Sequence, residues 1–253
     1  MTLIFCVMLI NILQVRESTM DFLRTITEST PLLIEGIKVT IFISLISLFI
    51  GMLIGFFACI MGMSKNGLLR GISGAYIWII RGTPMIVQAF IVYFGMPQVI
   101  QMIQETMGHA PDFRIEAFTA GVITLSLNAG AYLSEIFRSG ISAVPKGQTE
   151  AARSLGLSSS RTMFKVVLPQ AFKVAIPSMV NQFIITIKDT SILSVIGLAD
   201  IVNRGKVYVG KSYQFFATYI IIAVYYLVVI SILMVFSKML EKKINYERKS
   251  NSN

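Results

Sequence analysis

The octet GKVYVGKS at residues 205–212 has the residue types and spacing of a phosphate-binding loop, G-x-x-x-x-G-K-S/T. Such a loop cradles nucleotide phosphates with backbone N–H groups, but only between a buried strand and the N-terminus of a helix in a water-soluble domain. Here the octet leads into a long apolar run, and no second soluble domain supplies magnesium ligands or a catalytic acid. We interpret the match as coincidence, with Gly205 and Gly210 as turn residues and Lys206 and Lys211 as solvated charges. We therefore expect no catalytic residue and no enzymatic activity.

The composition favours lipid over water as the surroundings of this chain. Hydrophobic residues make up 55% of it and charged residues 14%, against roughly 25% charged residues in ordinary soluble domains. Five stretches approach or exceed the roughly 18–20 residues that a helix needs to cross about 30 Å of hydrocarbon. Because peptide groups in a bilayer must be satisfied internally, we expect an all-α integral membrane protein with five transmembrane helices. The five stretches are residues 39–62, 85–103, 117–134, 174–199 and 215–237.

Lysine and arginine residues predict the orientation of these spans, since short cytoplasmic loops collect basic residues. The loops after the first and third spans and the C-terminal tail hold thirteen basic residues, whereas the opposite side holds six. We therefore expect the N-terminus outside and the C-terminus inside. The thirteen are Lys65, Arg70, Arg138, Lys146, Arg153, Arg161, Lys165, Lys173, Lys238, Lys242, Lys243, Arg248 and Lys249, and the six are Arg16, Arg24, Arg114, Arg204, Lys206 and Lys211.

The longest polar stretch, residues 138–170, lies on the predicted cytoplasmic side. Pro145 favours the start of a short helix, and Gly156 is suited to its left-handed stop. A second short helix is predicted over residues 158–168, with a serine as N-cap and Pro169 at its limit. The pattern indicates a helical hairpin that protrudes from the membrane, with small residues on one side that suit a groove in another protein.

This loop resembles the EAA loop of ABC importer permeases, although the family usually has Ile where this chain has Val166. The residues that carry the resemblance are Glu150, Ala151, Ala152, Gly156, Leu168 and Pro169. Further segments are similar to the permeases that import polar amino acids, and the likeness runs from about residue 36 to the C-terminal tail. These segments are GIKVT at 36–40, RGTP at 81–84, LNAGAYLSEIFRSGI at 127–141, VPKGQTEAARSLG at 144–156 and KDTSILSVIGLAD at 188–200.

The resemblance implies a type I ABC importer permease bundle in the cell membrane, surrounded by lipid. It implies three protein partners: a dimer of cytoplasmic ATPase subunits, an external amino-acid-binding protein, and a second permease subunit that is either a copy or a paralogue. ATP and magnesium would bind to the partner ATPase, and no cofactor to this chain. We expect a transport domain at residues 36–240 and a cytoplasmic tail at 241–253. Residues 1–35 fit poorly, and residues 1–19 suggest either an extra segment at the membrane surface or a start site placed too early.

A different class of function is an ion-coupled secondary transporter or channel that works without an ATPase. Its hallmark would be an internal repeat with paired broken helices, and we find none in this sequence. The formal charge of +9 is typical of anchoring near anionic lipid, because no basic stripe interleaved with aromatic residues predicts nucleic-acid binding. His109 stands alone, and Cys6 and Cys59 lie in apolar runs, so no metal site is predicted.

Polar residues inside the predicted spans are candidates for a translocation pathway. In the fourth span Asn181 lies seven residues before Lys188, and Gln182 seven before Asp189, so each pair shares a helix face. For these four residues the sequence favours equally a stripe that faces the pathway and a purely structural role in helix packing. In the third span Asn128, Tyr132 and Glu135 recur at helical spacing and favour a cavity-facing stripe.

Arg81 in the RGTP segment allows two interpretations. Either the arginine lies at the cytoplasmic interface after a flat helix over residues 68–80, or the span begins near Leu69 and the segment is a helix break that lines a site. The GxxxG motif at Gly51 and Gly55 predicts close helix packing inside the chain.

Overall fold

The computed structural model describes the backbone of residues 2–250 and the side chains of residues 20–242. Throughout this part of the chain every regular element is a helix, which confirms the predicted all-α class. Most are α-helices, but η1 and η2 are π-helical and η3 is a 3-10 helix. The elements are α1 (Thr2–Gly62), α2 (Gly67–Gly82), α3 (Met85–Phe90), η1 (Ile91–Gly95), α4 (Met96–Thr106), α5 (Ala117–Ser142), α6 (Lys146–Ser154), α7 (Ser159–Thr162), η2 (Met163–Val167), α8 (Leu168–Asp189), η3 (Thr190–Ile196), α9 (Ile201–Ser212) and α10 (Phe215–Ser250).

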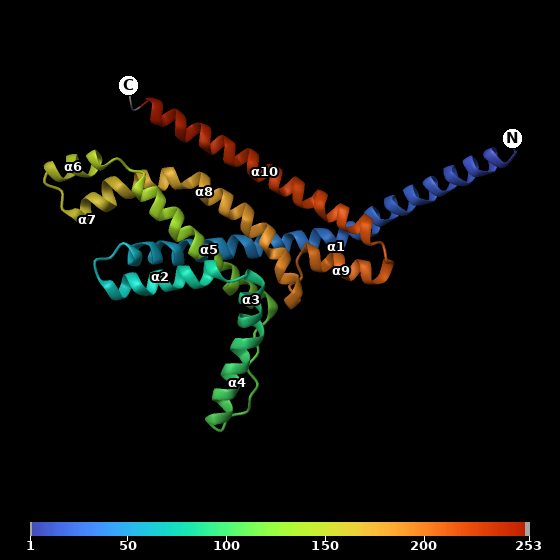
Figure 1. Cartoon of the computed structure of the whole chain (residues 1–253), viewed down its shortest axis with the longest axis horizontal. Helices are drawn as coiled ribbons and strands as arrows, with labels where there is room; N and C mark the ends of the chain where they lie inside the picture. The colour runs from blue at the N-terminus through green and yellow to red at the C-terminus, as the bar shows by residue number, and fades with distance from the viewer. Residues whose placement is uncertain (1, 251–253) are drawn as a thin grey trace.

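Helices α1, α5, α8 and α10 form a bundle that follows the long axis of the molecule (Figure 1). Helix α5 is central, because it packs against α1, α2, α3 and α8 and half of its 26 residues are buried. A hairpin of α6 and α7 lies at one end of the bundle, and α9 lies at the other (Figure 1). Helices α3 and α4 leave the bundle at a steep angle and form an arm (Figure 1).

Four helical stretches among the described residues are long and apolar enough to cross a membrane. They match four of the five predicted spans and confirm a multi-pass membrane protein. The predicted span at 117–134 lies in α5 and is not among them, because polar side chains such as Thr124, Ser126 and Asn128 lower the hydropathy of this helix. The four stretches are Met20–Gly62, Met85–Thr106, Ser159–Ile196 and Phe215–Lys242.

The GxxxG glycines bring α1 against α5 within the chain, as the motif predicts. A Cβ atom added to Gly51 would lie 3.2 Å from the Cβ of Ala129, and one added to Gly55 would lie 2.8 Å from the carbonyl oxygen of Gly130. The second distance is shorter than real Cβ contacts, so a side chain at Gly55 would push the two helices apart. Backbone contact between α1 and α5 therefore depends on Gly55.

Each π-helical segment is followed by a proline in the first turn of the next α-helix. Pro97 follows η1, and Pro169 follows η2. Proline lacks the N–H group that a continuous α-helix would use, and the wider π turn accommodates the missing hydrogen bond. The prediction that Pro169 ends the second loop helix is therefore wrong, because the chain stays helical from Ser159 through Pro169 to Asp189.

Helix α1 is uninterrupted from Thr2 to Gly62, with Pro31 inside it. It passes through residues 35 and 36, where the expected boundary of the transport domain falls. The side chains of residues 1–19, that of Cys6 included, lie outside the described residues, so the expectation for this segment is not tested.

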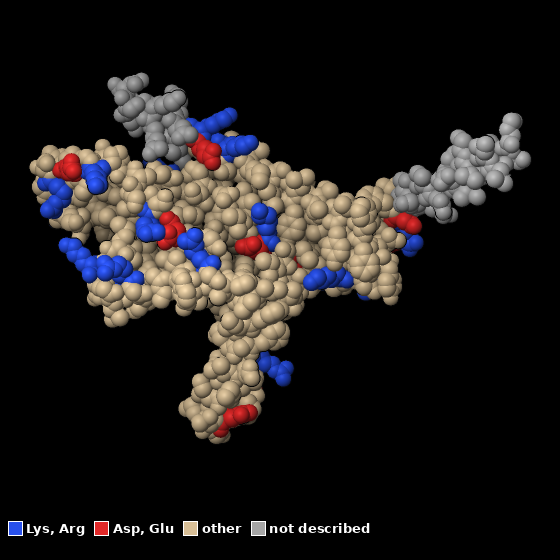
Figure 2. All heavy atoms as spheres, viewed as in Figure 1, with Lys and Arg blue, Asp and Glu red and all other residues tan. Residues whose placement is uncertain are grey.

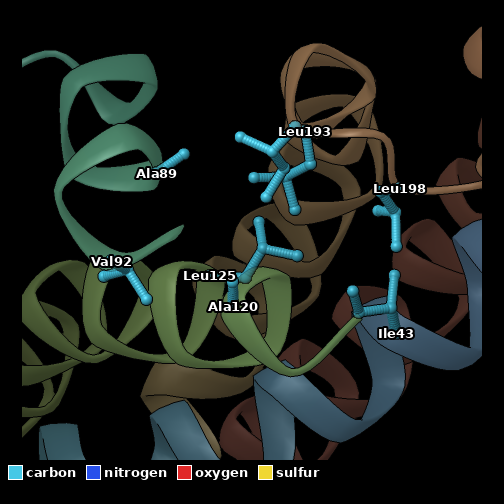
Figure 3. Packing of buried hydrophobic residues seen from close by; sticks show 8 residues of the cluster. Ile43, Ala89, Val92, Ala120, Leu125, Leu193 and Leu198 are labelled. Atoms are coloured by element: carbon cyan, nitrogen blue, oxygen red, sulfur yellow. The ribbon is translucent and has the colours of Figure 1, made fainter. Parts of the chain in front are cut away.

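Apolar packing fixes the root of the arm (Figure 3). Ala89 of α3 and Val92 of η1 are buried in one cluster with Ala120 and Leu125 of α5 and Leu193 of η3. Because α5 and η3 hold these residues, the arm cannot move at its root without disturbing the centre of the bundle.

Candidate functional site

A cavity of about 710 Å³ lies between the C-terminal part of α1, helix α2 and the C-terminal half of α5. Helix α2 contributes Arg70 and Arg81 to its lining, and α5 contributes Tyr132, Glu135 and Arg138. Of the predicted pathway residues, Arg81 and Tyr132 are therefore brought together here although they are far apart in the sequence. Residues of α8 do not line this cavity.

The cavity carries an excess of positive charge. The guanidinium carbon of Arg81 lies 5.2 Å from the ring centre of Tyr132, and its Nη1 lies 3.8 Å from Oε2 of Glu135. Arg138 pairs with the same carboxylate, and Glu135 is the one acidic residue in a lining that holds three arginines, Arg70, Arg81 and Arg138. These pairs are partly exposed and contribute little stability, which leaves the guanidinium groups free to bind an anion instead. Charged side chains also lie along the middle of one face of the bundle (Figure 2).

The RGTP segment is a helix break that a buried glutamine bridges. Thr83 and Pro84 have extended backbones between α2 and α3. Gln88 Nε2 lies 2.7 Å from the carbonyl oxygen of Ile80, 3.1 Å from that of Thr83 and 2.9 Å from Thr83 Oγ1. Asn128 Nδ2 of α5 donates to Gln88 Oε1 at 3.1 Å. Asn128 is 8% exposed and does not line the cavity, unlike Tyr132 and Glu135 of the same predicted stripe. Gln88 is a functional candidate that sequence reasoning missed.

Helix α2 runs beside α1 and buries Ser73 against it, while most of its other side chains are exposed. Ser73 Oγ donates to the carbonyl oxygen of Ala58 at 2.7 Å, and Tyr76 OH donates to that of Leu127 at 2.7 Å. These bonds tie α2 to both α1 and α5. The structure places Arg81 at the end of α2 in the lining of the cavity, as the second interpretation expects, and the membrane depth of α2 stays a prediction.

The four predicted pathway residues of α8 fall into two pairs on different faces of the helix, as their seven-residue spacing predicts. Asn181 and Lys188 are exposed, whereas Gln182 is buried and Asp189 is half-buried. The exposed pair lies on a face of α8 that this chain leaves uncovered. The buried pair lies toward the other helices of the bundle.

The predicted boundaries of the first loop helix are confirmed. Pro145 is the N-cap of α6, which ends at Ser154. Gly156 follows with φ of +83°, a left-handed conformation that a residue with a Cβ adopts only with strain. Ser158 then caps α7 and accepts a hydrogen bond from the N–H of Arg161 at 3.4 Å.

The surface of this hairpin differs from the expected one. Ala152 is 5% exposed, because α6 packs it against the following helical segment, so this alanine faces the hairpin itself. Glu150 and Ala151 are exposed, and Leu155 has 84% of its surface exposed. Sequence reasoning missed Leu155, whose signal is an apolar residue placed directly before the stop glycine.

The octet at 205–212 forms the last two thirds of α9, so the prediction that its glycines are turn residues is wrong. Gly205 is buried where α9 meets α10, and an added Cβ would lie 2.3 Å from Cδ1 of Ile222. Lys211 and Ser212 lie in the last turn of the helix, where carbonyl oxygens repel phosphate. Lys206 donates to Ser194 Oγ at 2.9 Å, so it is not simply solvated. The geometry excludes a phosphate-binding loop.

Asp200 begins α9 and is fully buried. Its Oδ1 accepts a hydrogen bond from the N–H of Asn203 at 2.9 Å, while Oδ2 has no hydrogen-bond partner. Burial raises the pKa of this carboxyl to about 6, against the weaker opposing effects of backbone N–H groups and Lys206. No group of three or more His, Cys, Asp or Glu side chains that could hold a metal occurs within the described range.

A bundle of membrane-length helices around a cationic cavity, with a helical hairpin at one end, defines a membrane-embedded transport subunit. Residues 47–246 match the family described as "Binding-protein-dependent transport system inner membrane component". The chain belongs to this family and is a permease subunit of an ABC importer in the cell membrane.

Curated relatives support this membership. The "Probable amino-acid ABC transporter permease protein YckA" of Bacillus subtilis (strain 168) is 40% identical over 85% of this chain and 90% of the relative. The "Arginine transport system permease protein ArtQ" of the same organism is 37% identical over 89% and 97%. The "Glutamine transport system permease protein GlnP" of Escherichia coli (strain K12) is 36% identical over 76% and 84%.

Solved structures share the fold. One chain of an amino acid ABC transporter, crystallised with histidines, has a TM-score of 0.77 and 37% identity over 87% of this chain and 97% of its own. A chain of the MetNI methionine ABC transporter in an inward-facing conformation has a TM-score of 0.66 at 18% identity, which shows a common fold alone. The prediction of an ABC importer permease bundle is confirmed.

Family membership decides between the functions that the sequence left open. The permeases of this family transport their substrates and are not themselves catalytic, so the prediction that this chain is not an enzyme is confirmed. The alternative of a self-sufficient secondary transporter or channel is not supported.

Proposed function

We propose that this permease imports polar amino acids and that the cationic cavity receives their α-carboxylate group. The observation that carries the proposal is the placement of Arg81 over Tyr132 and beside Glu135, because guanidinium groups bind carboxylates in a bidentate geometry. Glu135 can accept the α-ammonium group while Arg138 compensates its charge. Relatives named for glutamine and arginine transport support a polar amino acid as the substrate.

The exposed face of α8 continues the proposed pathway. Asn181 and Lys188 would face a second permease subunit, either a copy or a paralogue, across the route of the substrate. Gln182 and Asp189 would hold α8 in position from the bundle side. Asn128 would not contact the substrate but would hold Gln88 through its hydrogen bond. Charged side chains along the middle of one face support this arrangement, since charge within a membrane belongs at a pathway or an interface with protein (Figure 2).

We further propose five crossings by α1, α2 with the following break, α5, α8 and α10, with the N-terminus outside and the C-terminus inside. Helix α2 has 16 residues and extends about 24 Å, so it needs the break and α3 to approach the membrane thickness. The arm of α3 and α4 is then no crossing by itself. Exposed apolar side chains on α10, such as Leu227, Ile232 and Val235, would face lipid.

The hairpin of α6 and α7 is proposed to dock on a cytoplasmic ATPase dimer, which binds ATP and magnesium. Glu150, Ala151 and the exposed Leu155 would contact the ATPase, while Ala152 and Gly156 hold the hairpin in shape. Leu168 and Pro169 would join this hairpin to α8 through the π-helical η2, so that motion of the hairpin reaches the pathway helix. Residues 36–240 would form the transport domain and 241–253 its tail, and an external amino-acid-binding protein would deliver substrate at the α9 end.

The test is uptake into proteoliposomes that contain this permease with its ATPase and binding protein. Labelled glutamine and labelled arginine are offered separately, with ATP or a non-hydrolysable analogue inside. We expect ATP-dependent uptake of at least one of them. Uptake that follows an ion gradient and needs no ATP would overturn the proposal.

A further inference from the structure

The buried amide of Gln88 satisfies the carbonyl groups that the helix break exposes. Helix α2 ends at Gly82, and the extended Thr83 and Pro84 leave the last carbonyls of α2 without their helical partners. Thr83 Oγ1 donates to the carbonyl oxygen of Ile79 at 2.8 Å, and Gln88 Nε2 contacts those of Ile80 and Thr83. In a bilayer, which offers no water to bind them, these carbonyl groups would otherwise be left unsatisfied.

The segment held by Gln88 is the one that carries Arg81. Arg81 lies between Ile80 and Thr83, whose carbonyl oxygens are both within hydrogen-bond distance of Nε2. The partners of Arg81 in the cavity are Tyr132 and Glu135 on α5.

Asn128 connects this segment to the same face of α5 that faces the cavity. Tyr132 and Glu135 follow Asn128 by four and seven residues, so the three side chains share one helix face. The amide pair and the partners of Arg81 therefore form one strip of contacts along α5. A shift of the break along α5 would therefore change the contact between Gln88 and Asn128 and the contacts of Arg81 with Tyr132 and Glu135 at the same time.

We propose that Gln88 and Asn128 are a positioning pair for transport: they fix residues 80–83 against α5 and so hold the Arg81 guanidinium over Tyr132 and beside Glu135. The inference rests on the proposed role of the cavity. Neither residue of the pair lines the cavity, so both act through Arg81.

Other contacts leave this task to the pair. Tyr76 ties α2 to α5 five residues before Arg81, and Ala89 anchors α3 in the core one residue after Gln88. Between these two anchors, among the described residues, Met85 packs on the same apolar cluster, and the contact from Asn128 to Gln88 is the side-chain hydrogen bond that joins the break to α5. The pair is buried, so water does not replace the lost bond when one partner is removed.

The first test measures geometry and needs no substrate. In a chain with Cys6→Ala and Cys59→Ala, cysteines are introduced as Arg81→Cys and Glu135→Cys, and a short bifunctional thiol reagent is applied to the permease bound to its ATPase. We expect Gln88→Met to lower the crosslinking yield severalfold. The control is Thr124→Val, which removes a buried hydroxyl donor of α5 one turn before Asn128 but keeps both amides of the pair, so the yield should be unchanged. An equal yield with and without Gln88 overturns the proposal, whether or not the chain transports amino acids.

The second test separates positioning from a structural role. With Arg81 intact, we expect Gln88→Met to raise the KM for labelled glutamine or arginine by roughly tenfold or more, because a misplacement of about 1 Å in a positioned group can cost about 10²-fold. The exchange Gln88→Asn with Asn128→Gln keeps both amides and should recover most of the lost affinity. A lower maximal rate or lower abundance with unchanged KM would mean a structural role and overturn the proposal. If Gln88→Met does not accumulate in the membrane, Asn128→Ser, which removes the donor to Oε1, is used for both measurements.

Discussion

At the scale of single residues, Arg81 carries the proposed recognition of substrate. Arg81→Ala should raise the KM for the transported amino acid by at least about tenfold, because a charge-assisted bond to the carboxylate is worth roughly 1.5–3 kcal/mol. Arg81→Lys keeps the charge but loses the planar guanidinium over Tyr132. Its KM should therefore lie between that of the original protein and that of Arg81→Ala. Uptake in proteoliposomes provides the measurement. The exposed Arg114 lies outside the cavity, and Arg114→Ala should leave KM unchanged.

Asp200 predicts a pH dependence of stability. Its pKa is about 6 in the folded chain and 3.8 in the unfolded reference, so the folded state binds the proton more tightly between these values. The free energy of unfolding should therefore fall as the pH rises from about 4 through 6, by on the order of 1–3 kcal/mol.

Asp200→Asn should remove this dependence and keep α9 capped, because asparagine is also a good N-cap. Thermal unfolding of both proteins from about pH 3.5 to 7, which covers the interval between the two pKa values, is the measurement. Asp200→Ala is the matched control, since it loses the cap to Asn203 and should be less stable at every pH. A parallel pH profile for the Asn variant and the original protein would contradict the assignment.

At the scale of helices, the contact between α1 and α5 depends on a missing side chain. Gly55→Ala should lower the free energy of unfolding by about 1–3 kcal/mol, because the new Cβ would lie 2.8 Å from the carbonyl oxygen of Gly130. Gly71→Ala is the matched control: it lies inside α2 with nothing within 4 Å, and alanine should stabilise the helix by up to about 1 kcal/mol. Thermal unfolding in detergent is the measurement, and equal destabilisation by both variants would contradict this explanation.

Local chemistry made the loop hairpin predictable, while long-range contacts determine the rest. Pro145 and Gly156 act through their own backbone preferences, so the boundaries of α6 follow from sequence. The bond from Asn128 to Gln88 joins residues 40 positions apart, and no spacing rule indicates it. Likewise, the octet of α9 contains two glycines that indicate a turn locally, but packing of Gly205 on α10 keeps it helical.

The same distinction explains the direction of the arm. Residues 85–103 have the composition of a span, yet α3 and α4 leave the bundle axis because Ala89 and Val92 are anchored on α5 (Figures 1 and 3). Composition predicts which residues leave water. It does not predict the angle at which the helix lies, which depends on tertiary packing.

At the scale of the whole molecule, the hairpin of α6 and α7 and helix α9 lie at opposite ends of the bundle (Figure 1). In the proposed arrangement, an ATPase docked on the hairpin acts on the substrate through α5, whose C-terminal half lines the cavity, and through α8, the two helices that adjoin the hairpin. A partner shifts this equilibrium only if it binds two states of the hairpin with different affinity. Coupling therefore requires a hairpin that keeps its shape when the partner pushes on it. Gly156 determines this shape through its left-handed backbone conformation.

Gly156→Val should uncouple ATP hydrolysis from uptake. Valine in the left-handed conformation of Gly156 is strained by at least about 1–2 kcal/mol, so α6 would be displaced relative to α7 while the membrane helices keep their packing. We expect ATPase activity of the reconstituted complex to persist while the number of amino acids imported per ATP falls severalfold. Gly147→Ala lies in α6 with nothing within 4 Å and should keep the original ratio. An unchanged ratio in the Gly156→Val protein would exclude the hairpin from coupling, and a loss of both activities together would assign it to binding of the ATPase alone.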